Sequence, residues 1–175
     1  PSFDPVGVIG RVHSPMAVSV HNITWFATSS ALGSTDRIVE ALNWITGGLS
    51  EITHEKVKSY HGAKMILLRA QIKRKKDAKQ SICHLGPDFL KTMANLPDLS
   101  ERIDEDNVLH IRLNISSLMG QSIDFPEQGS GEDVKGRIKL ELYPGDNPVE
   151  KARDMLGNAA IIAEKNGLPI ITDAE

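Results

Sequence analysis

The sequence of 175 residues has very little cysteine, and Cys83 is its single thiol. A lone cysteine cannot form a disulfide within the chain, and it cannot build a cysteine-rich metal site. One free thiol in a chain of this length is typical of a reducing compartment. The composition therefore predicts a cytoplasmic location.

Long apolar runs are also missing. No stretch reaches the roughly 18 consecutive apolar residues that a membrane helix needs, and no basic segment followed by an apolar one opens the chain. Hydrophobic residues still make up 40% of the sequence and charged residues 25%, which are ordinary values for a folded domain. We therefore expect a soluble protein with a sizeable core and no membrane partner.

Aromatic residues are scarce, with four Phe, two Trp and two Tyr, or 5% of the chain. The apolar surroundings of Trp25 and Trp44 favour buried positions for both. Few aromatic rings then remain to stack on the bases of a single strand. If the protein binds a nucleic acid, the composition favours recognition of shape and phosphates.

Catalytic motifs are absent as well. The six histidines show no pair at metal-ligand spacing, and neither standard glycine-rich phosphate loop occurs. Asp104-Glu105-Asp106 resembles a carboxylate cluster, but without a second acidic motif it indicates an exposed turn. Cys83 and His84 are sequence neighbours and would point apart on a helix. We predict no enzyme and no cofactor, and an active site built from scattered polar residues is the remaining alternative.

Charge is the feature that stands out. The net charge is −3, yet residues 55–79 hold nine basic and two acidic side chains, so the rest of the chain is acidic on balance. This separation predicts a molecule with one positive side. A strand face that carries Lys and Arg can equally be a solvated surface, and the charge pattern alone leaves both interpretations open.

The pattern along the chain predicts one α+β domain. Residues 1–19 are expected to form a flexible leader, and residues 20–175 a single domain. Alternating or strand-like runs are found at 21–27, 52–59, 64–73, 109–115 and 134–143, and helical spacing at 35–45, at 77–96 with an interruption at Gly86-Pro87, and after Asn147. The order predicts an antiparallel or mixed sheet with helices packed on one face.

If helices cover one face of the sheet, the other face is open and cationic. Alternate residues of a strand lie about 6.6 to 6.8 Å apart, close to the spacing of phosphates along a nucleic-acid strand. The run Lys73-Arg74-Lys75-Lys76 joins a strand to a helix and suits backbone contacts. The candidate RNA-binding residues are Lys56, Lys58, Arg69, Lys73, Arg74, Lys75, Lys76, Arg112, Arg137 and Lys139, with Lys135 on the same strand face and His61 and His110 as weaker candidates.

Two segments carry a resemblance to a known family. Tyr60-His61-Gly62 precedes an Ile/Leu-rich strand and a Lys-rich helix start, and residues 102–113 read RIDEDNVLHIRL. Between about Val20 and Gly157, the chain resembles the archaeal RNA-binding proteins described as predicted exosome subunits, which also carry a domain-of-unknown-function label. The resemblance implies a fold similar to ribosomal protein L5, an archaeal source and a role with structured RNA.

A rival hypothesis is a protein-interaction subunit. Met65 and Leu67 share the outward face of one predicted strand, and Phe26 lies on the outward face of another. Such a mixed face could dock a protein partner or a second copy of the chain. We predict a non-catalytic RNA-binding accessory protein, and the protein-interaction subunit is the alternative.

Overall fold

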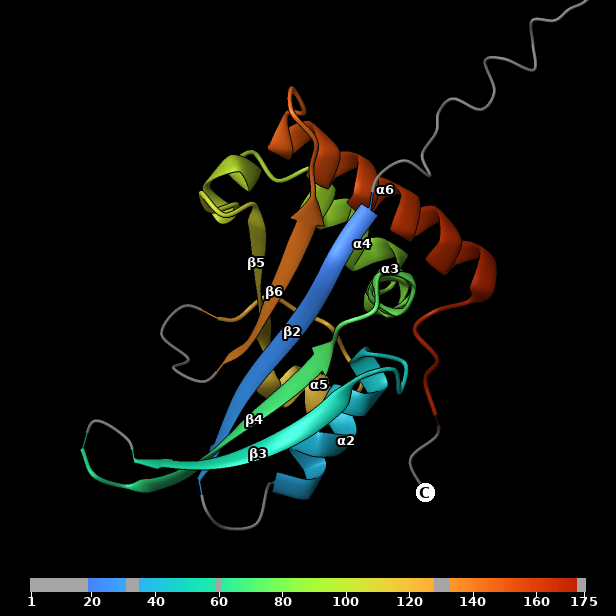
Figure 1. Ribbon diagram of the computed structural model, residues 1–175. Coiled ribbons are helices and arrows are strands. Elements are labelled where there is room, and N and C mark those ends of the chain that lie inside the picture. Colours follow the sequence, from blue (N-terminus) through green and yellow to red (C-terminus); the bar gives the residue numbers. More distant parts are fainter. Residues whose placement is uncertain (1–18, 31–34, 59–60, 128–132, 173–175) are drawn as a thin grey trace, which may run out of the picture.

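The computed structural model describes residues 19–30, 35–58, 61–127 and 133–172. Most of the predicted leader, residues 1–18, and most of the acidic segment at 127–133 lie outside the described residues. The elements, in chain order, are β2 (Ser19–Ser30), α2 (Thr35–Ile45), β3 (Glu51–Lys58), β4 (Lys64–Ile72), α3 (Lys75–Ile82), the 3-10 helix η2 (Cys83–Leu85), α4 (Pro87–Ala94), the 3-10 helix η3 (Leu99–Arg102), β5 (Val108–Asn114), α5 (Ile115–Met119), β6 (Asp133–Glu141) and α6 (Pro148–Asn166) (Figure 1).

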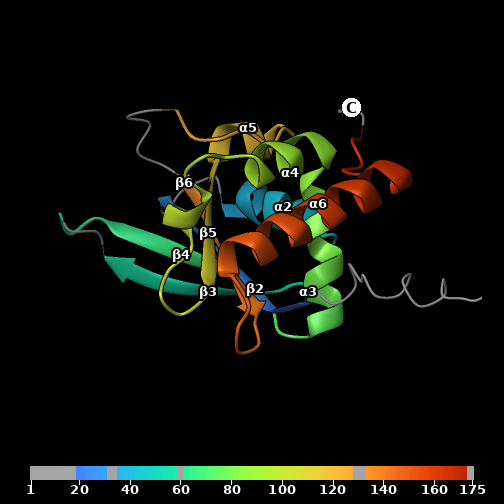
Figure 2. The same ribbon diagram turned by 90° about the horizontal axis from the view of Figure 1, so that it is seen from above.

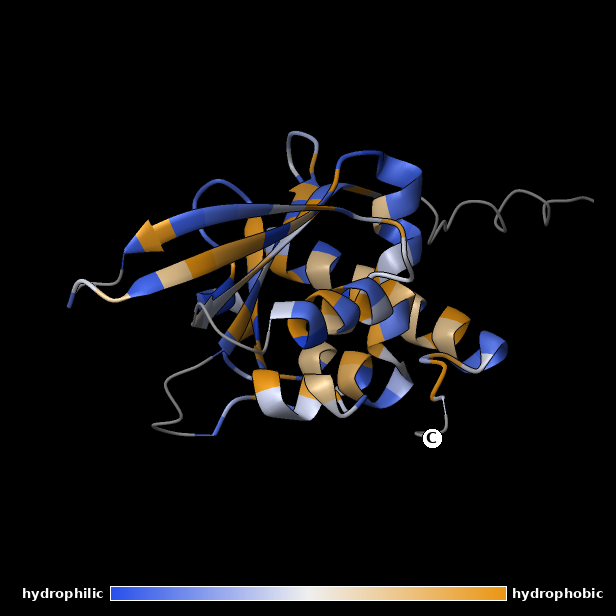
Figure 3. Ribbon diagram, turned by 90° about the horizontal axis from the view of Figure 1, so that it is seen from below, coloured by the Kyte–Doolittle hydropathy of each residue, from blue (hydrophilic) through white to orange (hydrophobic). Residues whose placement is uncertain are grey.

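The strands form one antiparallel five-stranded sheet in the order β3-β4-β2-β6-β5. Helices α2, α4, α5 and α6 lie on one side of it, whereas α3 lies beyond the end of β4 and reaches the level of the sheet (Figures 2 and 3). This confirms the predicted α+β class, with an antiparallel sheet and helices on one face. The alternation of apolar and polar residues along a strand decides which side of the sheet the helices cover. In β2, Ile23 and Trp25 are buried on the covered side, whereas Thr24 between them faces the other side and is only partly buried.

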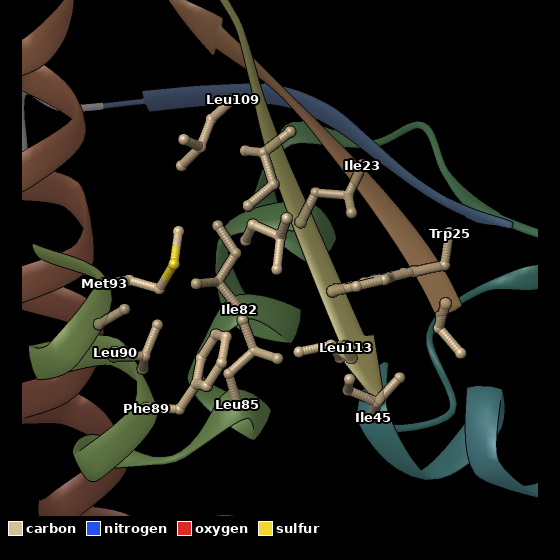
Figure 4. Packing of buried hydrophobic residues seen from close by; sticks show 14 of the residues in the cluster. Ile23, Trp25, Ile45, Ile82, Leu85, Phe89, Leu90, Met93, Leu109 and Leu113 are labelled. Atoms are coloured by element: carbon tan, nitrogen blue, oxygen red, sulfur yellow. The ribbon is translucent and has the colours of Figure 1, made fainter. Parts of the chain in front are cut away.

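The core lies between the sheet and the helices. Figure 4 shows its centre, where side chains from both layers meet: Ile23, Trp25, Leu109 and Leu113 from strands, and Ile45, Ile82, Leu85, Phe89, Leu90 and Met93 from α2, α3, η2 and α4. Trp25 is 2% exposed, as the sequence predicted, and Trp44 is partly buried. A core of this size keeps the sheet rigid, and it therefore fixes the positions of the side chains on the opposite face.

Helix α6 begins and ends where its sequence predicts. The Asn147 side chain accepts hydrogen bonds from the backbone N–H of Val149 (2.9 Å) and of Glu150 (3.2 Å), and Pro148 occupies the first turn. Gly167 ends the helix in the left-handed region, with φ of 64°. The small residues on its buried side let α6 pack closely against α4.

One predicted strand end is wrong. Ile115 was expected on the inward face of a strand that includes 109–115, but β5 ends at Asn114 and Ile115 begins the short helix α5. The Asn114 side chain accepts a hydrogen bond from the backbone N–H of Ser117 at 2.9 Å. This N-cap satisfies a free donor of the first turn and favours the helix over a longer strand. Ile115 is buried nonetheless.

The predicted helix at 77–96 divides into α3, η2 and α4, and the predicted interruption at Gly86-Pro87 is confirmed. Gly86 has φ of 84°, in a region that residues with a Cβ rarely adopt. Its position is also crowded, because a Cβ there would lie 2.7 Å from Pro169. No helix in the described part of the chain is long and apolar enough to cross a membrane.

Candidate nucleic-acid interface

The uncovered side of the sheet, which we call the open face, is organised into rows that cross the strands. In the first row, Arg112 of β5 pairs with Lys135 of β6, Lys135 with Phe26 of β2, and Phe26 with Arg69 of β4. We call these four residues the Phe26 row. Neighbouring strands lie about 4.8 Å apart, so the row spans roughly 14 Å between its end Cα atoms. Three cations and one aromatic ring thus share one line.

A second row lies two residues along each strand. His110 pairs with Arg137, Arg137 with Thr24, and Thr24 with Gln71. In the third row Val108 pairs with Lys139, and Lys139 with Asn22. Lys135, Arg137 and Lys139 therefore form a column on β6 with the roughly 6.7 Å spacing of alternate strand residues.

A shallow depression lies on the open face between the second and third rows. It has a volume of about 250 Å³ and is lined by Asn22, Thr24, Val108, Arg137 and Lys139. Its walls offer an amide, a hydroxyl and two cationic groups. These groups hydrogen-bond to phosphate and ribose oxygens in nucleic-acid complexes.

The cations of the open face differ in how far neighbours neutralise them. Arg112 lies 3.4 Å from a carboxylate oxygen of Asp133, and the Lys139 ammonium donates to the backbone carbonyl of Asp106. Within the described residues, Lys135 and Arg137 form no ion pair, and both are exposed. The least neutralised charge of the open face therefore lies at the centre of β6.

Arg69 has a different partner. Its guanidinium carbon lies 5.3 Å from the centre of the Phe26 ring, a cation–π contact across the β2–β4 pair. Both side chains are partly exposed. Sequence reasoning placed each of them on an outward face but missed their contact, because the register between β2 and β4 was unknown.

At one edge of the open face, Asp104 holds the turn before β5. Its carboxylate accepts hydrogen bonds from the backbone N–H of Asp106 (2.8 Å) and Val108 (3.1 Å), and it lies 2.7 Å from Nε2 of His110. The hydrogen bond with His110, with the two backbone N–H groups in a lesser role, lowers the pKa of Asp104. The carboxylate run at 104–106 is therefore a turn, as expected.

The run at 73–76 lies where β4 joins α3, as predicted. Lys73 follows the strand, Arg74 is the N-cap residue of α3, and Lys75 begins the helix. Arg74 lies 3.9 Å from Asp77, and Lys75 forms an ion pair with Glu141. The hydrogen bond to Glu141 raises the pKa of Lys75. Lys73 and Lys76 are exposed and form no ion pair among the described residues.

Lys56 and Lys58 were expected to join the open face, but they lie on the other side of the sheet. Lys56 pairs with Ile66 and Lys58 with Lys64, and Ile66 faces the same way as the buried Leu68. These lysines stay exposed because the outer halves of β3 and β4 extend past the helices as an arm (Figures 1 and 3). The arm, residues 55–58 and 64–67, thus carries its own cationic face, opposite in direction to Arg69.

In the part of the chain that the structure describes, the remaining His, Cys, Asp and Glu side chains do not cluster into a further site. Within the described ranges, no group of three or more His, Cys, Asp or Glu side chains could hold a metal ion. Burial raises the pKa of the Cys83 thiol and lowers the pKa of His84. The imidazole of His84 packs against Gly47, where a Cβ would collide with it, while the Cys83 sulfur faces the carbonyl of Lys79.

An α+β domain with an uncovered, cationic antiparallel sheet is the class that this fold and surface define. The model of the family described as RNA binding matches residues 22–141, which include all five strands almost entirely. The chain belongs to this RNA-binding family. The predicted family resemblance is thereby confirmed.

Solved structures support the fold. The chain is similar to Mth689, a DUF54 protein from Methanothermobacter thermautotrophicus, with 23% identity, a TM-score of 0.65 and coverage of 79% of this chain and 98% of that one. It is also similar to protein AF2318 from Archaeglobus fulgidus, with 20% identity, a TM-score of 0.61 and coverage of 80% and 99%. No curated protein matches the sequence significantly.

Proposed function

We propose that this protein binds structured RNA through the open face and has no catalytic role. One observation carries the proposal: Lys135, Arg137 and Lys139 form a cationic column on the uncovered side of the sheet, flanked by Arg112 and Arg69. Membership of the RNA-binding family supports the same function. Cations on a rigid surface bind phosphates and release the counterions condensed around the RNA.

The open face and the strand–helix junction would act together. Phosphate contacts are assigned to Arg69, Arg112, Arg137 and Lys139 on the open face, with Lys135 added, and to Lys73, Arg74, Lys75 and Lys76 at the junction. Lys56 and Lys58 on the arm would reach RNA that wraps around the sheet edge, because their side chains point away from the open face. A role in RNA processing or with the exosome remains a prediction of the family resemblance, and so does a fold similar to that of ribosomal protein L5.

The test is a titration of a labelled RNA stem-loop, followed by fluorescence anisotropy at about 50 to 200 mM salt. The wild-type affinity should fall linearly on a plot of log K against log salt. The double variant Lys135→Gln/Arg137→Gln should bind more weakly, and its salt slope should be smaller by about 1 for each cation removed. A matched control is Arg37→Gln/Lys165→Gln, which removes two exposed cations from α2 and α6 in the helix layer.

Equal slopes for both double variants would show that the open face does not hold the phosphates. An affinity that salt leaves unchanged would remove the phosphate model altogether.

The alternative of a protein-docking face has one observation in its favour. Met65 and Leu67 lie on the open face beside Arg69 and are only half-buried. Light scattering on the purified chain separates the two functions, because a stable dimer through this patch would cover the Phe26 row. A monomer that binds RNA supports the main proposal.

A further inference from the structure

Phe26 occupies an unexpected place for an aromatic residue. It lies on β2, the central strand, and among the described strands it is the one Phe, Tyr or Trp whose side chain is on the open face. Its cross-strand neighbours are Lys135 on one side and Arg69 on the other. A partly exposed apolar ring between two cations contributes nothing to the core on the opposite side of the sheet.

The surroundings leave the ring partly exposed. The neighbours of Phe26 along its own face of β2 are Thr24 and Thr28, both short and polar. Arg69 lies over the ring at 5.3 Å. Aromatic rings and guanidinium planes are the two side-chain surfaces on which proteins stack unpaired nucleobases. The pair thus forms a flat surface at the β4 end of the Phe26 row.

We propose that Phe26 and Arg69 form a stacking site for one unpaired RNA base. This inference rests on the proposed function and adds a substrate class to it. The RNA would be a stem with a bulged or looped-out nucleotide, whose base stacks at Phe26 while the neighbouring phosphates contact Lys135 and Arg137. In an intact duplex the faces of each base are covered by its neighbours, so Phe26 would add nothing to duplex binding.

The geometry matches this arrangement. Lys135 is the direct cross-strand partner of Phe26, so their Cβ atoms are about 4.5 to 5.5 Å apart. The flexible Lys135 side chain can therefore reach the phosphate of a nucleotide whose base lies on the ring. Arg137 is two residues further along β6, at the distance of the next phosphate. The overall scarcity of aromatic residues does not weaken this site, because one base needs one ring.

The experiment compares two RNA hairpins that differ by one residue: an intact stem, and the same stem with a single bulged 2-aminopurine. Both stems are closed by a non-nucleotide linker, so that neither hairpin has an unpaired base in its loop. Three proteins are titrated with each: the wild type, Phe26→Leu, which keeps an apolar side chain but has no ring, and Phe26→Trp, which keeps a ring. Circular dichroism confirms that all three are folded. Emission of the 2-aminopurine reports stacking directly.

The wild type and Phe26→Trp should prefer the bulged hairpin by on the order of tenfold and change the 2-aminopurine emission. Phe26→Leu should lose both the preference and the emission change, yet bind the intact stem as the wild type does. Two outcomes would overturn the stacking site and leave the proposed function standing: equal wild-type affinity for both hairpins, or an equal loss for both in Phe26→Leu. Wild-type protein that binds neither hairpin would overturn the inference together with the proposed function.

Discussion

Gly136 of β6 lies directly opposite Trp25 of β2, and the indole of Trp25 fills the space where a Cβ of residue 136 would stand. Such a Cβ would be 2.7 Å from Cε3 and 2.8 Å from Cη2 of the indole, and closer still to Cζ3. The missing side chain lets the largest core residue pack flat against the sheet. The residues on either side of Gly136 are Lys135 and Arg137, so the same close packing supports the cationic column.

Gly136→Ala should therefore destabilise the protein. The added methyl group would force Trp25 or β6 to move, and overpacking of this kind costs about 1 to 3 kcal/mol of unfolding free energy. Urea denaturation at neutral pH measures the loss. The matched control is Gly157→Ala on α6, where a Cβ would meet nothing within 4 Å. That variant should instead gain about 0.5 to 1 kcal/mol, because alanine favours the helix. A Gly136→Ala variant with the same unfolding free energy as the wild type would show that the indole has room to move.

Lys64→Glu should stabilise the arm and weaken RNA binding. Lys58 and Lys64 are direct cross-strand partners, and like charges in this position repel. Replacing one of them by glutamate turns repulsion into attraction, worth about 0.2 to 1 kcal/mol in urea denaturation. Lys64→Gln, which only removes the repulsion, should lie between the wild type and Lys64→Glu in stability. RNA affinity that survives Lys64→Glu unchanged would show that the arm does not contact RNA.

Asp104→Ala should destabilise the turn before β5. The variant loses the acceptor for the N–H groups of Asp106 and Val108 and for His110. The expected loss of unfolding free energy at neutral pH is on the order of 1 to 2 kcal/mol. Denaturation by urea at a series of pH values measures it.

The pH dependence of that loss has a definite sign. Because the pKa of Asp104 is lowered in the folded protein, its stabilising effect is complete above the ordinary aspartate pKa and disappears as pH falls through the lowered value. The wild type and Asp104→Ala should therefore converge in acid. A difference that stays constant down to pH values below the lowered pKa would show that the carboxylate charge plays no part.

The sequence predicted most of the fold because its signals are local. Alternation in β2 and β6 gave the buried and open faces, and Asn147 with Gly167 gave the ends of α6. Helix α5 was missed because it has only five residues, although Asn114 is a recognisable N-cap residue. A helix this short shows no periodicity.

The candidate site was less accessible, because it depends on which strands pair and in which register. Phe26 and Arg69 are 43 residues apart in sequence, and their contact follows from the register between β2 and β4 alone. The side of the sheet on which Lys56 and Lys58 lie could have been predicted from the sequence. Both are an even number of residues from Ile52 on the same strand, so they face the same side as Ile52, which contacts the core. The resemblance indicated RNA, but only the strand order could bring Arg112, Lys135, Phe26 and Arg69 into one line.

The most direct test of the central claim is an NMR titration that follows the arginine Nε–Hε signals as an RNA stem-loop is added. Arg153 provides an internal reference, because its guanidinium donates to the carbonyls of Ala94 (2.9 Å) and Leu96 (3.2 Å) in the helix layer. We predict that the signals of Arg69, Arg112 and Arg137 shift and that the signal of Arg153 does not. Bound RNA that shifts Arg153 and leaves the three open-face arginines unchanged would contradict an RNA-binding open face.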